Sequence, residues 1–319
     1  MGAAKTRVVA LSGGIGGAKL ALGLSRVLSG ADLMVVANTG DDFEHLGLSI
    51  SPDLDTLMYT LAGLDDPQRG WGRRDETWTF MAALKALGGE TWFSLGDGDL
   101  ATHVERTRRR AAGESLSSIT ADFCRRLKIA ARIVPMTDEA VRTRLRTAEG
   151  WLDFQDYFVR RRCAPAVLEL AYDGADNAHP HPDLLAALRD PSLRAVVICP
   201  SNPFVSIEPI LAVRGMREAV AMCAAPVVAV SPIIGGRAVK GPTAKMMAEL
   251  GLPVSALAVA QRYGDLLDAY VLDPADQAHS SQLGIPVTVT HTLMSTIEDR
   301  ERLARHVLAT ADAVARAAA

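Results

Sequence analysis

Residues 8–17 read Val-Val-Ala-Leu-Ser-Gly-Gly-Ile-Gly-Gly and decide the fold of this 319-residue chain. The apolar run at 8–11 predicts a buried strand, and the glycine-rich turn after it leads into a segment with apolar side chains at 20, 24, 27 and 28. Because that spacing places one apolar stripe along a helix, the segment predicts an amphipathic helix. A second apolar run follows at 33–37. Strand, turn, helix and strand in this order form a βαβ unit, which predicts a parallel sheet.

Short apolar runs recur beyond this unit, and several alternate with helical patterns. They lie at residues 133–134, 167–170, 196–199, 227–230, 270–272 and 287–289. We therefore predict an α/β fold with a Rossmann-like three-layer core and a mainly parallel sheet. Between residues 53 and 127 helical patterns dominate, so we expect 1–52 and 128–319 to form the nucleotide-binding core and 53–127 a helical insertion. Residues 143–159 predict a hairpin, and 298–319 a final helix.

Composition and charge exclude several classes of protein. Hydrophobic residues make up 49% of the chain and charged residues 22%, a globular mixture. A net charge of −3 provides no positive field, so we expect neither a nucleic-acid nor a membrane partner. The uncharged stretch 219–236 contains two prolines, which argues against a membrane span. Without a signal-peptide pattern, a cytoplasmic protein is expected, and homodimers are the commonest assembly.

Cysteine spacing predicts no special chemistry. The four cysteines are far apart, with no CxxC motif, so we expect reduced thiols rather than a zinc site or disulfides. They are Cys124, Cys163, Cys199 and Cys223.

Residues 12–17 follow a strand and open a helix, which is where backbone amides and the helix dipole can hold a phosphate. The standard motifs do not fit, because GxGxxG would need a glycine at Lys19 and no Gly-Lys-Ser/Thr exists. A tight turn for packing alone is the alternative. Lys19 lies one turn into the helix and could reach the same anion.

Four carboxylates follow the second strand within fifteen residues, namely Asp41, Asp42, Asp53 and Asp55. Magnesium takes one or two carboxylates together with phosphate oxygens, so this cluster beside a phosphate turn predicts a Mg²⁺ site. The alternatives are helix capping by Asp53 and a solvated turn at Asp41 and Asp42.

A third polar stretch, residues 94–103, predicts a turn into a helix capped by Asp97 or Asp99. His103 in this helix, and His45 near the acidic cluster, are either structural or catalytic. The basic run that contains Arg106 and residues 108–110 predicts a solvated helix face, with phosphate binding as the alternative.

Aromatic residues are only 5% of the chain but gather in the insertion and the hairpin. They either stack on a flat ligand or fill the seam between insertion and core. They are Trp71, Trp78, Trp92, Phe93, Trp151, Phe154, Tyr157 and Phe158.

Seven ordered motifs between residues 7 and 296 resemble the CofD/FbiA family of 2-phospho-L-lactate transferases of coenzyme F-420 biosynthesis. They are Ser-Gly-Gly-Ile-Gly-Gly at 12–17, Asn-Thr-Gly-Asp-Asp at 38–42, Ser-Pro-Asp-Leu-Asp-Thr at 51–56, Gly-Trp-Gly at 70–72, Leu-Gly-Asp with Asp-Leu-Ala-Thr-His at 95–103, Pro-Ser-Asn-Pro at 200–203 and Ser-Pro-Ile-Ile-Gly at 231–235.

The resemblance implies a Mg²⁺-dependent transferase with two small-molecule substrates. It would move a phosphorylated three-carbon acid, as 2-phospho-L-lactate or its phosphoenolpyruvate or phosphoglycerate equivalent, from a guanosine-diphosphate adduct to the terminal ribityl hydroxyl of the deazaflavin Fo. GMP would be released. The sequence leaves the identity of the acid open, because lactate, enolpyruvate and glycerate differ by only a few atoms.

Carried over position by position, the resemblance implies roles for individual residues. Asp55 and Ser94 match positions that contact Fo, with Asp55 and Asp41 as catalytic carboxylates and Asp41 and Asp53 as metal ligands. The remaining substrate-binding positions are expected to be Gly13, Gly14, Gly16, Gly17, Asn38, Asn202, Ser231 and Gly235.

One departure concerns Gly98, where the family commonly has arginine. The phosphate contact of that arginine would have to move to Arg73, Arg74 or Arg106. Two rival functions stay open. A non-catalytic, nucleotide-sugar-binding regulator of the YvcK type has a similar opening, and in a nicotinamide-dependent dehydrogenase Asp41 would bind ribose.

Overall fold

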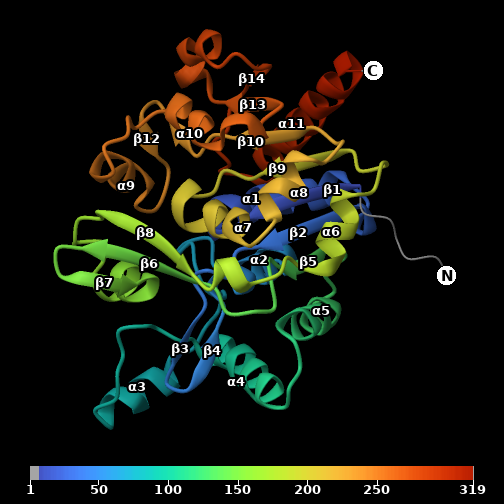
Figure 1. Cartoon of the computed structure of the whole chain (residues 1–319). Coiled ribbons are helices and arrows are strands. Elements are labelled where there is room, and N and C mark those ends of the chain that lie inside the picture. The colour runs from blue at the N-terminus through green and yellow to red at the C-terminus, as the bar shows by residue number, and fades with distance from the viewer. Residues whose placement is uncertain (1–6, 319) are drawn as a thin grey trace.

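The computed structural model describes residues 7–318, and its centre is a seven-stranded sheet in which every neighbouring pair is parallel (Figure 1). The strand order is β14-β13-β10-β9-β1-β2-β5. The strands are β1 (Val8–Ser12), β2 (Leu33–Ala37), β5 (Arg132–Pro135), β9 (Ala195–Ile198), β10 (Val227–Val230), β13 (Ala269–Leu272) and β14 (Val287–Val289). The α/β prediction is confirmed, and the first unit is β1, α1 (Gly14–Val27) and β2 as expected.

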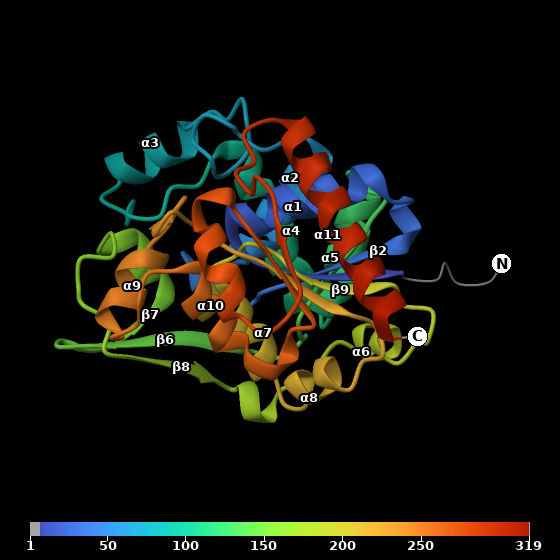
Figure 2. The same ribbon diagram turned by 90° about the horizontal axis from the view of Figure 1, so that it is seen from above.

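Side chains that alternate along the strands build two apolar clusters, one on each face of the sheet. Val8 and Ala10 of β1 belong to one cluster, and Val9 and Leu11 belong to the other. The first cluster is covered by α1, α2 (Pro52–Ala62), α5 (Leu116–Arg126) and α11 (Ile297–Ala318). Helices thus lie on both faces of the sheet, which gives three layers (Figure 2).

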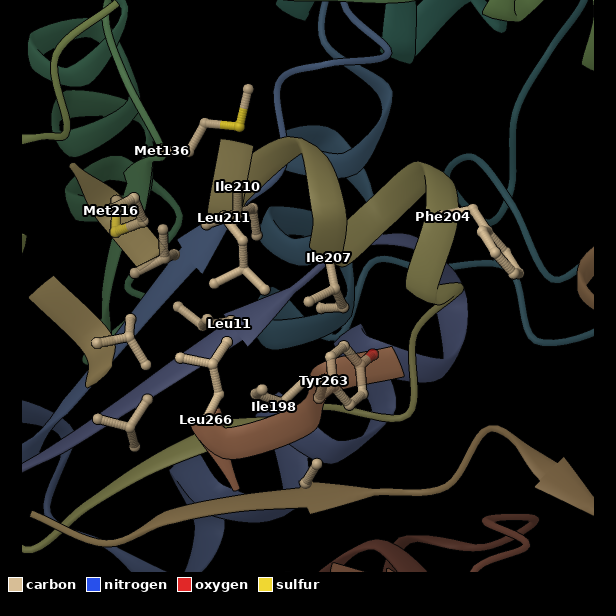
Figure 3. Close-up of a cluster of buried hydrophobic side chains, with 14 of the residues drawn as sticks. Leu11, Met136, Ile198, Phe204, Ile207, Ile210, Leu211, Met216, Tyr263 and Leu266 are labelled. Carbon is tan, nitrogen blue, oxygen red and sulfur yellow. The ribbon is translucent and has the colours of Figure 1, made fainter. Parts of the chain in front are cut away.

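The second face is covered by several shorter helices. They are α6 (Pro182–Leu188), α7 (Glu208–Ala212), α8 (Met216–Ala221), α9 (Thr243–Glu249) and α10 (Ala256–Tyr263), with a π-helical turn at Pro203–Ile207. Figure 3 shows this packing, where Leu11 and Ile198 from the strands meet Ile207, Leu211 and Tyr263. These side chains are fully buried or nearly so. Burial of such apolar surface on both faces holds the strand ends in place.

A separate three-stranded antiparallel sheet lies beside the core, with β6 (Arg142–Thr147) between β7 (Gly150–Asp153) and β8 (Glu169–Asp173). The predicted hairpin around Gly150 is confirmed as β6 and β7. The apolar run at 167–170 leads into β8, which pairs with β6 and not with the parallel sheet. A short two-stranded hairpin, β11 (Ile233–Ile234) and β12 (Arg237–Ala238), follows β10.

The segment between β2 and β5 contains β3 (Phe43–His45) and β4 (Leu48–Ile50), then α2, α3 (Thr79–Ala86), α4 (Asp97–Ala111) and α5. The β3–β4 hairpin was not predicted. Leu54, Leu57 and Met58 of α2 belong to the buried cluster beside α1. Farther from the sheet, α4 packs on β4 (Figure 1). The division into core and insertion at residues 53–127 stays a prediction.

All four cysteines are free, as expected. Within residues 7–318, no helix has the length and apolar character needed to cross a bilayer. The uncharged stretch 219–236 is divided among the end of α8, strand β10 and strand β11.

Candidate functional site

A cavity of about 500 Å³ opens at the carboxyl ends of β1, β2, β9 and β10, where parallel sheets bind their ligands. Nine of the predicted site residues line it, namely Gly13, Gly14, Gly16, Asp41, Asp53, Asp55, Ser94, Asn202 and Ser231. Three others lie outside its lining, namely Gly17, Asn38 and Gly235. Strand ends that are far apart in the sequence therefore converge on one site.

The glycine-rich turn serves both packing and the cavity. A Cβ on Gly16 would lie 2.4 Å from the Pro200 carbonyl oxygen, so only glycine allows this close approach to the end of β9. Gly14 has a φ of +62°, a left-handed conformation that favours glycine. Its amide donates a 2.6 Å hydrogen bond to Asp53, and the Gly13 amide donates to the Ser201 hydroxyl at 3.2 Å. These amides therefore hold side chains of the site.

Asp41, Asp42 and Asp53 form a buried acidic group that we call the Asp41 cluster. Each is at most 7% exposed, so the solvated-turn alternative for Asp41 and Asp42 is wrong. The Asn38 amide joins two of them, donating to Asp53 at 2.9 Å and to Asp41 at 3.3 Å. Ser51 donates to Asp42 at 2.8 Å. Asn38 thus shapes the site from behind the cavity wall, and Asp53 accepts from Asn38 and Gly14 rather than capping its own helix.

Burial without a cationic partner raises the pKa of all three carboxyl groups. Burial raises the pKa of Asp42 to about 7 and that of Asp53 to about 6. Burial, with repulsion from Asp53 and Asp42, raises the pKa of Asp41 well above its usual range. Among residues 7–318, none of the three makes an ion pair. Oxygen ligands that need positive charge, next to a cavity, fit a hard divalent cation such as Mg²⁺.

A second buried group, which we call the Asp55 cluster, contains Asp55, Tyr59, Asp99, His103 and Arg106. Arg106 is 1% exposed and clamps Asp55 with both terminal nitrogens, one of them 3.1 Å from Asp55 Oδ2. His103 Nε2 lies 3.2 Å from Asp99 Oδ2, and Tyr59 donates to the other Asp99 oxygen at 2.7 Å. Asp55 therefore already has a cationic partner, and Asp99 already has a hydrogen-bond donor.

The burial of Arg106 corrects the prediction of a solvated basic face. Arg108 does lie on the surface, 65% exposed, but Arg106 points inward to Asp55. Arg106 is thus occupied as the ion partner of a buried carboxylate and is not free to take over the phosphate contact of the family's arginine.

The turn before α4 is built differently from the prediction. The helix begins at Asp97, but its first amides, those of Gly98 and Asp99, donate to Glu76 at 2.7 Å each. Asp97 instead accepts from the amides of Thr79 and Phe80 at the start of α3. Arg73, the other candidate near Gly98, donates to the Gly98 carbonyl at 3.1 Å.

Some aromatic side chains fill the seam, and others line the cavity. Trp92 and Phe93 pack with Phe43 and His45 between β3 and the insertion. Burial lowers the pKa of His45, which is absent from the cavity lining. Trp71, Phe93, Phe154 and Phe158 face the cavity, and the last two stack at 5.3 Å between ring centroids. Aromatic rings therefore form part of the cavity wall.

Other predicted polar side chains form hydrogen bonds within their own turns. Asn202 accepts from the Phe204 amide at 2.9 Å, and the Ser231 hydroxyl bonds both polar atoms of the Ile233 backbone. The Gly235 amide donates to Asp276 at 2.8 Å. These residues give the crevice its shape and leave backbone atoms to meet a ligand.

Two lysines bring positive charge to the cavity. Lys19 and Lys240 line the cavity, and Arg300 lines a smaller pocket of about 90 Å³ that adjoins them. Lys19 donates to the Met294 carbonyl at 3.0 Å. Burial, followed by the charges of Arg300 and Lys240, lowers the pKa of Lys19. These cations, with Asp65 and Asp66 in the same smaller pocket, offer charged partners for an anionic ligand near the glycine-rich turn.

Sequence reasoning missed several lining residues. Gln155 and the residues 292–294 carry no motif, so nothing in the sequence singles them out. A signal did exist for the Asp55 cluster, because Tyr59 follows Asp55 by four positions and His103 follows Asp99 by four, which places each pair on one helix face.

Comparison with known proteins identifies the family of this chain. The profile of the family described as 2-phospho-L-lactate transferase CofD matches residues 8–308. A phosphoenolpyruvate transferase of Kitasatospora aureofaciens is 43% identical over 97% of this chain and 98% of its own length. One from Thermobifida fusca is 43% identical over 93% and 94%, and one from Mycobacterium leprae is 38% identical over 91% and 94%.

A solved structure supports the fold alone. A member of the UPF0052 family from Bacillus halodurans superposes with a TM-score of 0.65 at 13% identity, over 95% of this chain and 99% of that one. Together, the nearly complete profile match and the relatives near 40% identity place this chain in the CofD family of transferases.

Proposed function

We propose that this chain transfers phosphoenolpyruvate from its guanosine-diphosphate adduct to the terminal ribityl hydroxyl of the deazaflavin Fo, releasing GMP, with Mg²⁺ as cofactor. Enolpyruvate is chosen among the three acids because the relatives at 38–43% identity carry the name phosphoenolpyruvate transferase. The observation that carries the proposal is the buried Asp41 cluster, which makes no ion pair among residues 7–318, at the wall of a cavity lined by aromatic and basic side chains.

The atoms balance as follows. The ribityl oxygen forms a bond to the phosphorus that bears the enolpyruvyl group. The bond from that phosphorus to the bridging oxygen breaks, and its electron pair leaves with GMP. The hydroxyl proton passes to the protein or to water. The products are a phosphodiester of Fo and GMP, so no redox partner is needed.

Different side chains of the cavity suit the two substrates. Asp41 and Asp53 would hold Mg²⁺, which when bound supplies positive charge that stabilises the diphosphate during bond breaking. Lys19 and Lys240, which also line the cavity, would attract the anionic donor. Phe154, Phe158 and Trp71 would stack on the tricyclic ring of Fo.

Asp55 would orient the attacking hydroxyl of Fo. It lines the cavity, and the Arg106 clamp fixes both of its oxygens. A carboxylate held in this way accepts a hydrogen bond from the hydroxyl and positions the oxygen, which lowers the entropic part of the barrier. Ser94 lies in the same wall and would contact Fo beside Asp55. A homodimer stays a prediction.

The test is product analysis with matched donors. The purified chain is incubated with Fo, Mg²⁺ and guanylated enolpyruvate, lactate or glycerate, and products are resolved by mass spectrometry. We expect one GMP per phosphodiester and the highest kcat/KM with the enolpyruvyl donor. If no donor gives product, while a nucleotide sugar binds by calorimetry and Fo fluorescence does not respond, the chain is a regulator of the YvcK type and the proposal fails.

A further inference from the structure

The smaller pocket of about 90 Å³ adjoins the main cavity, and the reaction above gives it no ligand. The two share Ile15 of the glycine-rich turn and Thr56 and Tyr59 of α2. Thr56 directly follows Asp55, the carboxylate that would orient the Fo hydroxyl. The smaller pocket therefore lies beside the place where the phosphorus would react. Its volume suits a group of a few atoms rather than a nucleoside or a tricyclic ring.

Three basic side chains line this pocket, namely Lys19, Lys240 and Arg300. Among residues 7–318, none of the three makes an ion pair. Arg300 Nε is buried and has no hydrogen-bond partner in the same described part of the chain. Lys19 uses one of its N–H donors on the Met294 carbonyl. Donors therefore remain available on all three side chains.

Helix packing and one loop bring these cations to the pocket. Gly23 lies one helical turn after Lys19, and a Cβ there would be 2.2 Å from the Arg300 carbonyl oxygen, so glycine lets α1 approach α11 closely. Lys240 comes from the loop after β12. A Cβ on Gly70 would lie 2.3 Å from Lys240 Nζ, so the ammonium occupies space that a side chain at residue 70 would fill.

Two carboxylates line the same pocket, Asp65 and Asp66. Asp66 accepts hydrogen bonds from two backbone amides and lies 3.7 Å from the guanidinium of Arg69. Asp65 makes no ion pair among residues 7–318, so one unpaired carboxylate faces three unpaired cations. Burial, followed by the charges of the other two cations, lowers the pKa of Lys19, and the charge of Asp65 acts in the opposite direction. A surplus of positive charge thus suits an anion in the pocket.

The chemistry of the proposed donor identifies that anion. The donor carries a diphosphate, which lies with the metal site, and one further anionic group, the carboxylate of the three-carbon acid. The acid is bonded through oxygen to the reacting phosphorus, so its carboxylate is only a few bonds away from that atom. Guanidinium and ammonium groups bind carboxylates through charge-assisted hydrogen bonds.

We propose that Arg300, Lys240 and Lys19 form a subsite for the carboxylate of the three-carbon acid, an inference that rests on the proposed function. Arg300 donates hydrogen bonds to the carboxylate, and the two ammonium groups neutralise its charge. The three side chains bind and orient the acid and take part in no bond-breaking step. They make a guanylated acid bind more tightly than a guanylated molecule without the carboxylate.

The diphosphate is the competing ligand for these cations. Lys19 and Lys240 line the main cavity as well as the smaller pocket, so either anion could contact them. Arg300 lines the smaller pocket only, which makes it the residue that separates the two assignments.

The experiment measures binding by calorimetry in the full chain with Mg²⁺ and without Fo, so that no turnover occurs. The ligands are guanylated enolpyruvate, its carboxamide analogue and GDP. We expect the wild type to bind the acid about tenfold more tightly than the carboxamide, because the amide carries no charge. Arg300→Gln should weaken binding of the acid about tenfold and binding of the carboxamide and of GDP less than twofold.

The matched control is Arg305→Gln, which changes a 63% exposed arginine of the same helix outside both pocket linings. It should leave all three Kd values unchanged. A melting temperature shows whether each variant folds. Should Arg300→Gln not fold, Lys240→Gln in an exposed loop carries the test, with Lys85→Gln as its exposed control. Lys240→Gln should also weaken the acid more than the carboxamide.

Turnover with Fo gives a second readout. Arg300→Gln should raise the KM for the guanylated donor about tenfold and change the KM for Fo less than twofold, because the subsite contacts the donor alone. A purely structural role of Arg300 would lower the melting temperature and weaken the acid and the carboxamide equally.

Three outcomes overturn the inference. The first is equal affinity of the wild type for the acid and the carboxamide. The second is a folded Arg300→Gln that binds the acid as the wild type does. The third is an equal loss of affinity for GDP and for the acid in Arg300→Gln, which would assign Arg300 to the diphosphate. A wild type that shows the expected binding pattern but forms no phosphodiester overturns the proposed function and leaves the carboxylate subsite in place.

Discussion

Asp53 and Asp55 lie two positions apart in the first turn of α2, 7% and 5% exposed, yet their surroundings are opposite. Residues two apart on a helix point to different sides. Asp53 faces Asn38 and the Gly14 amide within the Asp41 cluster, whereas Asp55 faces Arg106 and His103. Among residues 7–318, Asp53 makes no ion pair, whereas Asp55 pairs with Arg106. Burial alone therefore does not identify a metal ligand; the missing counter-charge does.

The largest effect expected from this contrast is on turnover. Asp41→Asn removes one charge from the group that lacks a partner, so we expect kcat to fall by roughly 10³-fold or more. Stability at pH 8 should rise, because repulsion with Asp53 and Asp42 is relieved. Product formation and melting temperature are measured beside Asp265→Asn, an exposed aspartate. Wild-type rates in Asp41→Asn would remove Asp41 from the metal site.

The Asp55 cluster should respond in stability instead. Arg106→Ala leaves Asp55 buried and unpaired, so we expect a loss of about 3–5 kcal/mol of unfolding free energy in urea denaturation. Arg108→Ala, an exposed arginine on the same helix, should change it by less than about 1 kcal/mol. Equal effects of the two substitutions would show that Asp55 does not depend on Arg106.

The sequence predicted the Asp41 cluster better than it predicted the Asp55 cluster. Strands β2, β10 and β14 match the apolar runs because buried parallel strands are continuous apolar segments. Asp41 and Asp53 could be found because both follow strand β2 closely. The ion pair of Asp55 with Arg106 could not, because 51 residues separate the partners and a single arginine in a basic run gives no sign of pointing inward.

The β3–β4 hairpin illustrates a second limit. Its strands are three residues each, and its turn uses Leu46, a non-glycine residue with positive φ, followed by Gly47. Strands this short lack a measurable alternation, so they depend on tertiary packing against α4 and the aromatic residues around His45. Tertiary contact also decides the cap of α4. The carboxylate of Glu76, 22 positions before Gly98, takes the helix-capping role expected of Asp97 or Asp99.

The pH dependence of stability tests the same contrast between the Asp41 cluster and the Asp55 cluster. The pKa of Asp42 is about 7 and that of Asp53 about 6 in the folded protein, both above the usual value for aspartate. Groups whose pKa is raised by folding stabilise the protein at pH below about 4 and lose that contribution as pH rises through 6 and 7.

Without metal, we therefore expect the unfolding free energy to fall by several kcal/mol between pH 4 and pH 8. Added Mg²⁺ should restore much of it at pH 8, because the cation binds only the folded chain. Asp42→Asn should flatten the curve, whereas Asp265→Asn should leave it unchanged. A metal-free curve that rises over this range would contradict the assigned pKa directions.

The smallest expected effect is on Fo binding by an aromatic side chain of the cavity. Trp71 is 47% exposed and lines the cavity, so Trp71→Ala should weaken Fo binding about tenfold, worth about 1.4 kcal/mol, with little loss of stability. Fo fluorescence titration gives the Kd. Trp151→Ala, which removes a 42% exposed tryptophan outside the lining, is the control. Equal Kd values for the two variants would place Fo elsewhere.

The difference between the two carboxylate groups is tested most directly by a crystal structure grown with Mn²⁺ and GDP, with anomalous scattering recorded at the manganese edge. Our account predicts an anomalous peak within ligand distance of Asp41 and Asp53, in contact with diphosphate oxygens, and Arg106 still paired with Asp55. A peak bound by Asp55, Asp99 and His103, with Asp41 and Asp53 empty, would contradict it.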